Sequence, residues 1–182
     1  LVPFADWVLF THDTRPRIIQ NLGGIANLTF LPPRAKLTDV LAFDTGPGNM
    51  IIDATVAALS GGKLAYDRDG RWAARGKISE ELLAVCMTHP FLRRRPPKTT
   101  GREEFGEMFL KRLLAHARRL RLPDADIVAT ATDFTAASIA EAYRRALQFA
   151  GKVVVLVGVT LAAGVATWAL SPIKFQADMG VL

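Results

Sequence analysis

Two glycine-bearing segments, residues 21–27 (NLGGIAN) and 43–53 (FDTGPGNMIID), constrain this chain more than any other feature. Each follows a short apolar run and combines glycines with Asn or Asp. Glycine reaches backbone angles closed to other residues and lets the main chain approach a ligand closely. Consecutive amides in such turns form concavities that hold anions, most often phosphate. The pair therefore predicts one phosphate-handling site built from neighbouring strands, as in an enzyme of phosphorylated compounds.

The composition is that of a globular protein with one domain, because half of the 182 residues are apolar and 22% are charged. A net charge of +6 and a pI near 9.9 raise the question of nucleic acid. No recognisable nucleic-acid module accompanies the basic residues, so we expect an anionic small substrate and no nucleic-acid partner. The single cysteine, Cys86, excludes an intrachain disulfide, which fits a reducing cytoplasm.

Apolar runs and turn residues predict antiparallel strands at 18–22 and 25–31, joined by Gly23 and Gly24, and a short third strand at 40–43. A helix is predicted over 49–59, where apolar residues recur at helical spacing.

Helices dominate the rest of the chain. Ser79 is the predicted N-cap of a helix that ends near residue 89, and residues 93–101 (RRRPPKTTG) are predicted as an exposed loop. One amphipathic helix is predicted over 102–120 and a last helix over about 134–150. Strands first and helices afterwards indicate an α/β domain with the glycine segments at one rim of the sheet.

Residues 153–173 contain no charge, and this length is enough to cross a bilayer. Glycine, threonine, serine and proline dilute the segment, and a buried strand over 153–157, a glycine turn and a buried helix give the same run. We favour the soluble interpretation. A membrane anchor through 153–173 stays open, because apolar length alone is compatible with both.

Five ordered stretches resemble the anhydro-N-acetylmuramic acid kinases, a family of the sugar-kinase, Hsp70 and actin superfold. They are residues 1–10 (LVPFADWVLF), 21–27, 43–53, 96–105 (PPKTTGREEF) and 130–140 (TATDFTAASIA). The resemblance covers residues 1–151 and implies an α/β, ribonuclease H-like lobe with a mixed sheet and flanking helices. It makes residues 1–182 a single domain, the C-terminal lobe of the kinase truncated at both ends, with 153–173 as an atypical apolar segment.

The resemblance implies an ATP-dependent sugar kinase of bacterial cell-wall recycling, located in the cytoplasm. The family cleaves the 1,6-anhydro bond of anhydro-N-acetylmuramic acid with water and phosphorylates O6 from ATP, giving N-acetylmuramic acid 6-phosphate. The expected partners are the sugar, ATP and Mg²⁺, and a homodimer is compatible with them. The resemblance places the catalytic base upstream of Leu1, so the isolated chain is expected to be inactive. Asp133, where the family usually has Glu, is the candidate for an assisting acid.

The site residues are likewise carried over by resemblance. The ATP phosphates are expected near Gly23, Gly24 and Asn27. The transferred phosphoryl group and the sugar are expected near Asp44, Thr45, Gly46, Gly48 and Asn49. Asp44 is the candidate to orient Mg²⁺ or its water ligands. Structural roles compete with these functions, because Asp44 is also a typical turn residue and Asn49 a typical helix N-cap.

Four further motif residues have no derived role: Lys98, Thr100, Arg102 and Glu103. A T-x-x-E capping box explains Thr100 and Glu103 equally well. The chain departs from the family at 157–162 (VGVTLA), where a GGGAHN motif is expected for the adenosine, and the family pattern resumes near 173–181. A degenerate phosphate- or sugar-binding module without catalysis is therefore an alternative to the kinase fragment.

Overall fold

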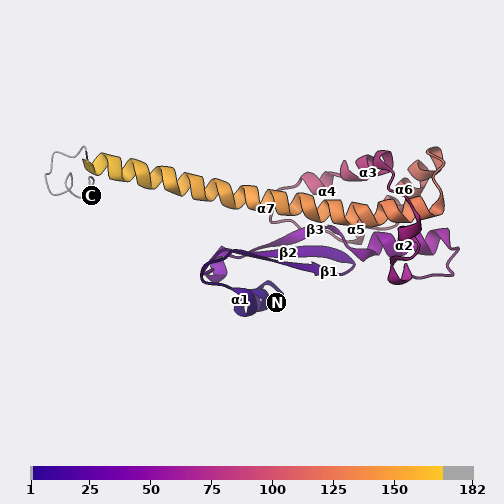
Figure 1. The fold of residues 1–182 in the computed structure, drawn as a ribbon, viewed down its shortest axis with the longest axis horizontal. Helices are drawn as coiled ribbons and strands as arrows, with labels where there is room; N and C mark the ends of the chain where they lie inside the picture. Colours follow the sequence, from indigo (N-terminus) through magenta and orange to yellow (C-terminus); the bar gives the residue numbers. More distant parts are fainter. Residues whose placement is uncertain (1, 170–182) are drawn as a thin grey trace. The chain divides into compact units, whose positions relative to one another are not determined.

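The computed structural model describes residues 2–169, with side chains for residues 2–146, and divides the chain into two units, residues 1–142 and 143–182. The elements of the first unit are α1 (Val2–Phe10), β1 (Arg17–Leu22), β2 (Ile25–Leu31), η1 (Leu37–Asp39), β3 (Leu41–Pro47), α2 (Asn49–Leu59), η2 (Arg68–Gly70), η3 (Ala73–Arg75), α3 (Glu80–Met87), α4 (Pro90–Arg93), α5 (Arg102–Phe105) and α6 (Glu107–Arg119) (Figure 1). Helix α7 (Asp124–Ala169) begins in the first unit and supplies the helix of the second.

The three strands form one sheet in the order β1-β2-β3, and both strand pairs are antiparallel. The predicted hairpin around Gly23 and Gly24 is confirmed. The third strand was predicted too short, because pairing with β2 continues through Asp44 and Gly46 to Pro47, with a register shift that leaves Thr45 out of the ladder. Only Gly48 therefore separates β3 from α2. The predicted mixed sheet is not found within residues 2–169, where every strand pair is antiparallel.

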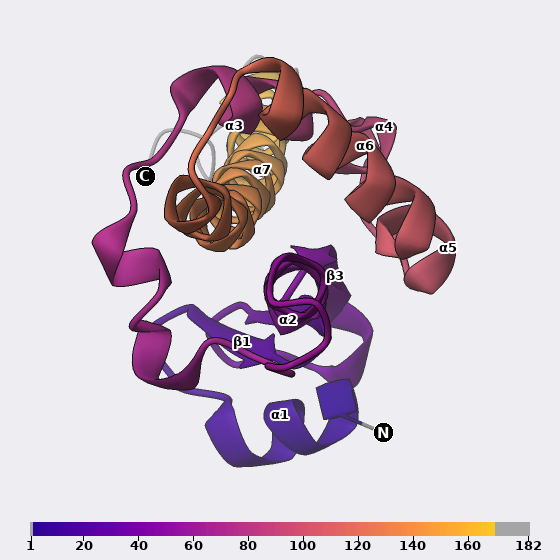
Figure 2. The ribbon, with the colours of Figure 1, turned by 90° about the vertical axis from the view of Figure 1, so that its right-hand side faces the viewer.

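Helix α1 lies on one face of the sheet and α2 on the other (Figure 2). The polar residue of α1 points inward: the Asp6 carboxylate is buried and accepts a hydrogen bond from the Thr29 hydroxyl at 2.6 Å. Several of its apolar residues, Phe4, Val8 and Leu9, are exposed, whereas Trp7 is half-buried. Helix α1 thus reaches the sheet through a buried polar contact and leaves apolar side chains at the surface.

Helix α2 has the bounds that the sequence predicts, Asn49–Leu59. It buries Ile51, Thr55 and Val56, which lie at helical spacing. The chain then passes through Gly61 and Gly62, both with positive φ, so the predicted glycine stop is also confirmed.

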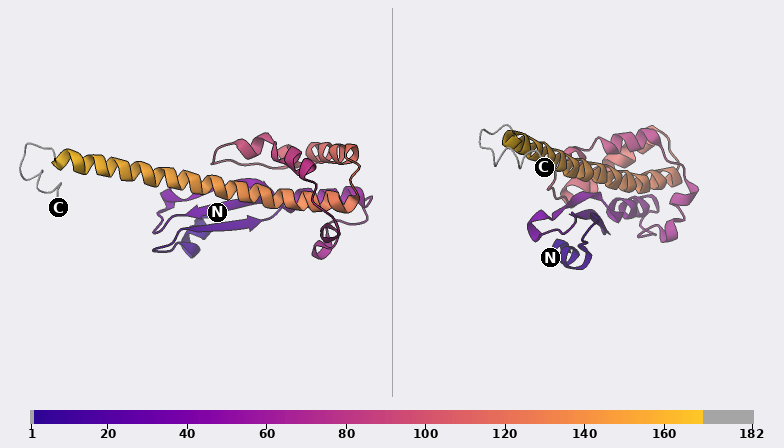
Figure 3. Two further views of the ribbon diagram at one scale, coloured as in Figure 1. Left: turned by 45° about the horizontal axis from the view of Figure 1, so that its top comes forward. Right: turned by 60° about the vertical axis from the view of Figure 1, so that its left-hand side comes forward.

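An aromatic core lies between the short helices and the first turns of α7. The Phe105 ring lies 5.6 Å from that of Phe91 and 5.3 Å from that of Phe109, which stacks on Phe134 at 5.5 Å. Figure 3 shows helices α3 to α6 gathered along the first part of α7. This packing holds both ends of the loop at residues 94–101, which joins α4 to α5.

His89 forms the edge of the aromatic core. Its ring centroid lies 4.6 Å from that of Phe105, and its Nε2 lies 3.8 Å from the carboxylate of Glu104. Glu104 also forms an ion pair with Arg94 at 2.5 Å. Burial lowers the pKa of His89; Glu104 opposes this shift, and Arg94 and Arg112 add to it.

Two helix predictions need correction. The predicted helix 102–120 is broken at Gly106, whose backbone approaches the Arg102 carbonyl so closely that a Cβ would lie 2.2 Å from that oxygen. The last helix begins at Asp124, well before residue 134. By contrast the N-cap at Ser79 is confirmed, since its Oγ accepts a hydrogen bond from the Leu82 amide at 3.3 Å.

The loop that carries Lys98 was predicted to be exposed, yet this side chain is only 7% exposed. Its Nζ donates to the carbonyl oxygens of Phe91 at 3.1 Å and Leu92 at 3.4 Å. The ammonium also lies 4.2 Å from the centroid of the Phe91 ring. Lys98 is buried because it satisfies carbonyl oxygens of the short helix α4.

The strand predicted over 153–157 is wrong, because α7 continues as a helix to Ala169. No proline interrupts residues 124–169, and isolated glycines cost a helix only about 1 kcal/mol each. Residues 170–182, which include the end of the apolar segment and the stretch where the family pattern resumes, lie outside the described residues. Among residues 2–146, whose side chains the structure describes, no helix is both long and apolar enough to cross a membrane.

Candidate functional site

The two glycine segments interlock at the amino end of α2. The Gly48 amide donates to the Gly24 carbonyl at 2.9 Å, the Asn49 amide to that of Gly23 at 2.9 Å, and the Met50 amide to that of Gly24 at 3.3 Å. Gly48 lies so close to the hairpin that a Cβ would be 2.0 Å from the Gly23 oxygen. The first amides of a helix have no partner within it, and here two hairpin carbonyls, those of Gly23 and Gly24, accept three hydrogen bonds from them. These three amides are therefore used within the protein and are not open to a phosphate in this structure.

Thr45 and Gly46 are enclosed by neighbouring elements. The Thr45 side chain is fully buried, and its hydroxyl donates to the Ala26 carbonyl at 3.1 Å. Gly46 faces α7, where a Cβ would lie 2.9 Å from the Ser138 hydroxyl. The contacts of these two residues hold β3 against β2 and α7.

Asn27 and Asp44 are partners across β2 and β3 and line a hollow of about 330 Å³. Val2 and Pro3 of α1 line the same hollow. The Asp44 carboxylate accepts a hydrogen bond from the Thr100 amide at 2.8 Å, while its own amide donates to the Lys98 carbonyl at 2.9 Å. Asp44 therefore lies in strand β3, and the alternative that it is a turn residue is wrong. Its two hydrogen bonds hold the loop before α5 in place.

Asp44 could serve as a single carboxylate ligand of a metal ion whose other ligands come from outside the protein. One carboxylate oxygen accepts the Thr100 amide, and the other has no hydrogen bond from a described residue. Within residues 2–169 no group of three or more His, Cys, Asp or Glu side chains could hold a metal ion. Mg²⁺ is commonly bound by one or two carboxylates together with phosphate oxygens and waters, so Asp44 fits that role without further protein ligands.

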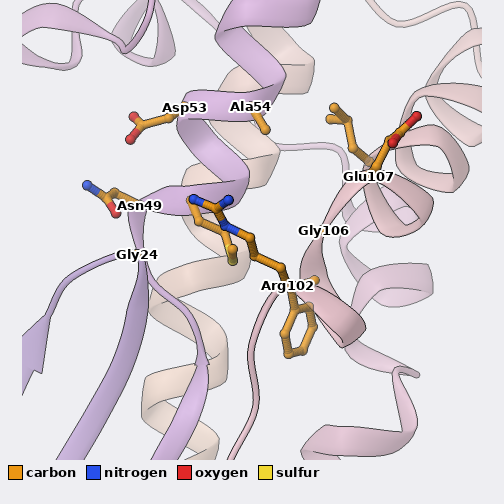
Figure 4. A pocket seen from close by; sticks show the side chains of 10 residues that line it. Gly24, Asn49, Asp53, Ala54, Arg102, Gly106 and Glu107 are labelled. Carbon is orange, nitrogen blue, oxygen red and sulfur yellow. The ribbon is translucent and has the colours of Figure 1, made fainter.

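A second hollow, of about 520 Å³, lies beside the first turn of α2 (Figure 4). Gly24, Asn49, Asp53 and Arg102 contribute polar groups to it. Asn49 and Asp53 project from one side of α2, one turn apart, and the Arg102 side chain extends toward the start of that helix. Burial raises the pKa of Asp53 above its ordinary value. The structure therefore separates Asn49 from Asp44, since the two line different hollows.

Asn49 is the first residue of α2, and the N-cap position belongs to Gly48. The side chain of Asn49 is exposed and does not cap the helix. Asp53 was not singled out from the sequence. The i, i+4 spacing from Asn49 on a predicted helix is the signal that places both on one face.

Asp133 lies on α7, half-buried, and no described residue forms a hydrogen bond or ion pair with it. Its neighbour Thr132 lines a further hollow of about 560 Å³, which Asn49 and Asp53 also line. The adjacent Thr135 hydroxyl donates to the Gly48 carbonyl at 2.9 Å. The segment that contains Asp133 is thus joined to the glycine segments by a direct contact.

The capping box that the sequence offers as an alternative for Thr100 and Glu103 is not formed. Gly101 is the N-cap of α5 and provides no side-chain hydrogen bond. The Thr100 hydroxyl oxygen is buried without a hydrogen-bond partner. The amide of Thr100 has the more definite role, because Asp44 accepts its hydrogen bond.

A comparison with protein families matches residues 1–165 to the model of anhydro-N-acetylmuramic acid kinase. The chain belongs to this family. Proteins named anhydro-N-acetylmuramic acid kinase from Caldanaerobacter subterraneus subsp. tengcongensis and Bacillus cereus are 43% and 46% identical to it, over 145 and 148 residues. The alignments cover 80% and 79% of this chain but 37% of each relative. This member of the kinase family thus matches little more than a third of the length of these relatives.

Proposed function

We propose that this chain is part of an ATP-dependent kinase that hydrolyses 1,6-anhydro-N-acetylmuramic acid and phosphorylates it to N-acetylmuramic acid 6-phosphate. The family membership supports this reaction, which serves peptidoglycan recycling in the bacterial cytoplasm. The three-stranded sheet and its helices would belong to one lobe of the sugar-kinase, Hsp70 and actin fold. We propose that residues 1–182 are the C-terminal lobe of that fold.

The observation that carries the proposal is the hollow shared by Asp44, Asn27 and the first turn of α1. In the family the catalytic base is expected upstream of the segment that α1 forms. Because Val2 and Pro3 line this hollow, a preceding segment of a longer kinase would approach it close to Asp44. A base there could activate water at the anomeric carbon.

Each residue has a distinct part in this mechanism. Bound ATP with Mg²⁺ would supply the phosphoryl group and neutralise its charge. One oxygen of Asp44 accepts the Thr100 amide, and the other would be available to hold the cation or its waters. The Asn27 side chain can hydrogen-bond to the sugar from the neighbouring strand. Asp133 is proposed as an assisting acid; aspartate is one methylene shorter than the usual glutamate, so its reach to the sugar is shorter.

Kinase activity of a chimera tests the proposal. The upstream part of the Bacillus cereus relative would be fused to this chain and given anhydro-N-acetylmuramic acid and ATP. We expect turnover by the chimera, none by the isolated 182 residues, and a loss of about 100-fold or more in the Asp44→Asn chimera. Asp39→Asn is the matched control, because Asp39 is an exposed aspartate of η1 that does not line the Asp44 hollow. Turnover by the isolated chain would show that the catalytic base lies within these 182 residues. It would then be wrong that an upstream segment supplies the base.

A binding module without catalysis is the second candidate. The observation that favours it is the use of the Gly48, Asn49 and Met50 amides by the hairpin, which removes three phosphate donors. Calorimetry with ADP and with the anhydro-sugar separates the two functions. Binding of either ligand together with an inactive chimera favours the module. The homodimer stays a prediction, for which the elution volume of the pure chain is the measurement.

A further inference from the structure

The loop that joins α4 to α5 lies against the outer edge of β3. Within the described sheet β3 is the last strand and pairs with β2 on one side. On its other side the Asp44 amide donates to the Lys98 carbonyl at 2.9 Å. The Thr100 amide in turn donates to the Asp44 carboxylate at 2.8 Å. Residues 98–100 therefore hold Asp44 at its backbone and at its side chain, so their position sets the direction of this carboxylate.

Lys98 anchors this loop to the core. Its ammonium donates to the carbonyl oxygens of Phe91 and Leu92, two buried residues, and lies 4.2 Å from the centroid of the Phe91 ring. A buried ammonium is costly even when it is hydrogen-bonded, and an apolar side chain would fill the same space at lower cost. Apolar contacts, however, have no direction, whereas hydrogen bonds to two carbonyl oxygens fix the loop relative to α4.

The neighbouring side chains of the loop do not provide the same anchor. Thr99 is exposed and lines the hollow of about 330 Å³ beside Asp44. The Thr100 hydroxyl oxygen is buried but forms no hydrogen bond with a described residue. The ion pair of Arg94 with Glu104 joins the two ends of the loop, four residues from Lys98 and four from Thr100. The place of the Thr100 amide therefore depends on the Lys98 ammonium two residues before it.

We propose that Lys98 is a positioning residue that acts through Thr100 on Asp44. By anchoring residues 98–100, the ammonium keeps one carboxylate oxygen of Asp44 on the Thr100 amide and leaves the other available to the hollow that Asp44 lines. This inference rests on the proposed function, in which the second oxygen would hold the cation or its waters. It gives Lys98 and Thr100 of the PPKTTGRE stretch a joint role in orienting Asp44, without contact between Lys98 and a substrate.

Amide hydrogen exchange of the 182-residue chain, measured residue by residue by NMR, tests the anchor without any ligand. In Lys98→Met the amides of Asp44 and Thr100 should exchange at least about fivefold faster, because both hydrogen bonds weaken. Lys63→Met is the matched control, since it removes the same charge from an exposed lysine, and it should leave both rates within about twofold. Val56→Ala removes buried volume from α2 and should speed exchange of the core amides together, with no excess at 44 and 100.

The chimera with the upstream part of the Bacillus cereus relative tests whether the anchor acts through Asp44. Lys98→Met should lower kcat about tenfold or more and raise the Mg²⁺ concentration that gives half-maximal rate, with KM for the sugar within about threefold. Combined with Asp44→Asn, the same substitution should cost less than about twofold further, because the group that Lys98 positions is absent. A residue that only stabilises the fold would lower activity by the same factor with and without Asp44→Asn.

Two results would overturn the inference. The first is exchange of the Asp44 and Thr100 amides that rises no more in Lys98→Met than in Val56→Ala. The second is an equal loss of activity from Lys98→Met with and without Asp44→Asn. Failure of the proposed function is distinguishable from both, because an inactive chimera counts against the kinase alone. The exchange measurement on the isolated chain then still decides whether Lys98 holds the Thr100 amide on Asp44.

Discussion

Replacement of Gly48 by alanine should separate the glycine needed for the fold from the glycines that face open space. An alanine Cβ at 48 would lie 2.0 Å from the Gly23 oxygen and 3.2 Å from the Ala26 amide nitrogen. Both are backbone atoms of a paired hairpin and cannot rotate away. The hairpin must therefore move off the start of α2, with loss of the hydrogen bonds from the Gly48, Asn49 and Met50 amides.

Each of these three hydrogen bonds contributes a net ~1 kcal/mol to stability, so their loss predicts a decrease of about 2–4 kcal/mol in the free energy of unfolding. A change of this size lowers Tm on the order of 10 °C in a chain of this length. Urea denaturation followed by circular dichroism measures it. Gly23→Ala is the matched control, because its nearest contact would be an ordinary 3.6 Å and its φ is not positive. Equal denaturation midpoints for the two variants would refute the steric argument.

Three other changes test separate parts of the fold. Lys98→Met should cost about 1–3 kcal/mol in urea denaturation, because it removes a buried donor to two carbonyl oxygens of α4; unchanged stability would contradict this role. The free energy of unfolding should fall as the pH drops below about 6.5, because the pKa of His89 is lowered in the folded chain and the unfolded chain takes up the proton first. Denaturation curves at about pH 7.5 and 5.5 measure this difference, and His89→Asn should make it smaller. Phe134→Ala should cost about 3–5 kcal/mol, whereas the exposed Phe4→Ala should change the unfolding free energy little, and similar values for both would place the core elsewhere.

Elements with strong local signals could be predicted from the sequence. The Gly23-Gly24 hairpin, helix α2 and the Ser79 cap are all confirmed, because each depends on residues within a few positions of one another. Turn glycines and capping hydroxyls act through their immediate neighbours, so their pattern is visible without tertiary structure.

Features that depend on distant residues could not be predicted. The burial of Lys98 depends on α4 carbonyls, and the extension of β3 depends on pairing with β2. The break at Gly106 comes from a close backbone approach that hydrophobic spacing does not reveal. Helix α7 passes through glycines at which the sequence predicts a turn, because isolated glycines weaken a helix without ending it.

The candidate site was predictable in part. The resemblance named Asp44, Asn49 and Arg102, and the structure shows that Asp44 lines one hollow while the other two line another. Asp53 was missed because a single aspartate within a helix carries no motif of its own. Whether these residues bind phosphate, sugar or Mg²⁺ stays a prediction for the experiments above.

The interlock at Gly48 also bears on the order in which the chain folds. Helix nucleation is unfavourable, because the first turn fixes several residues for a single hydrogen bond. At the start of α2 the carbonyls of Gly23 and Gly24 offer three additional hydrogen bonds, so a formed hairpin acts as a template for that first turn. Folding should therefore proceed from the hairpin to the helix, and substitutions that slow closure of the hairpin should delay α2 as well.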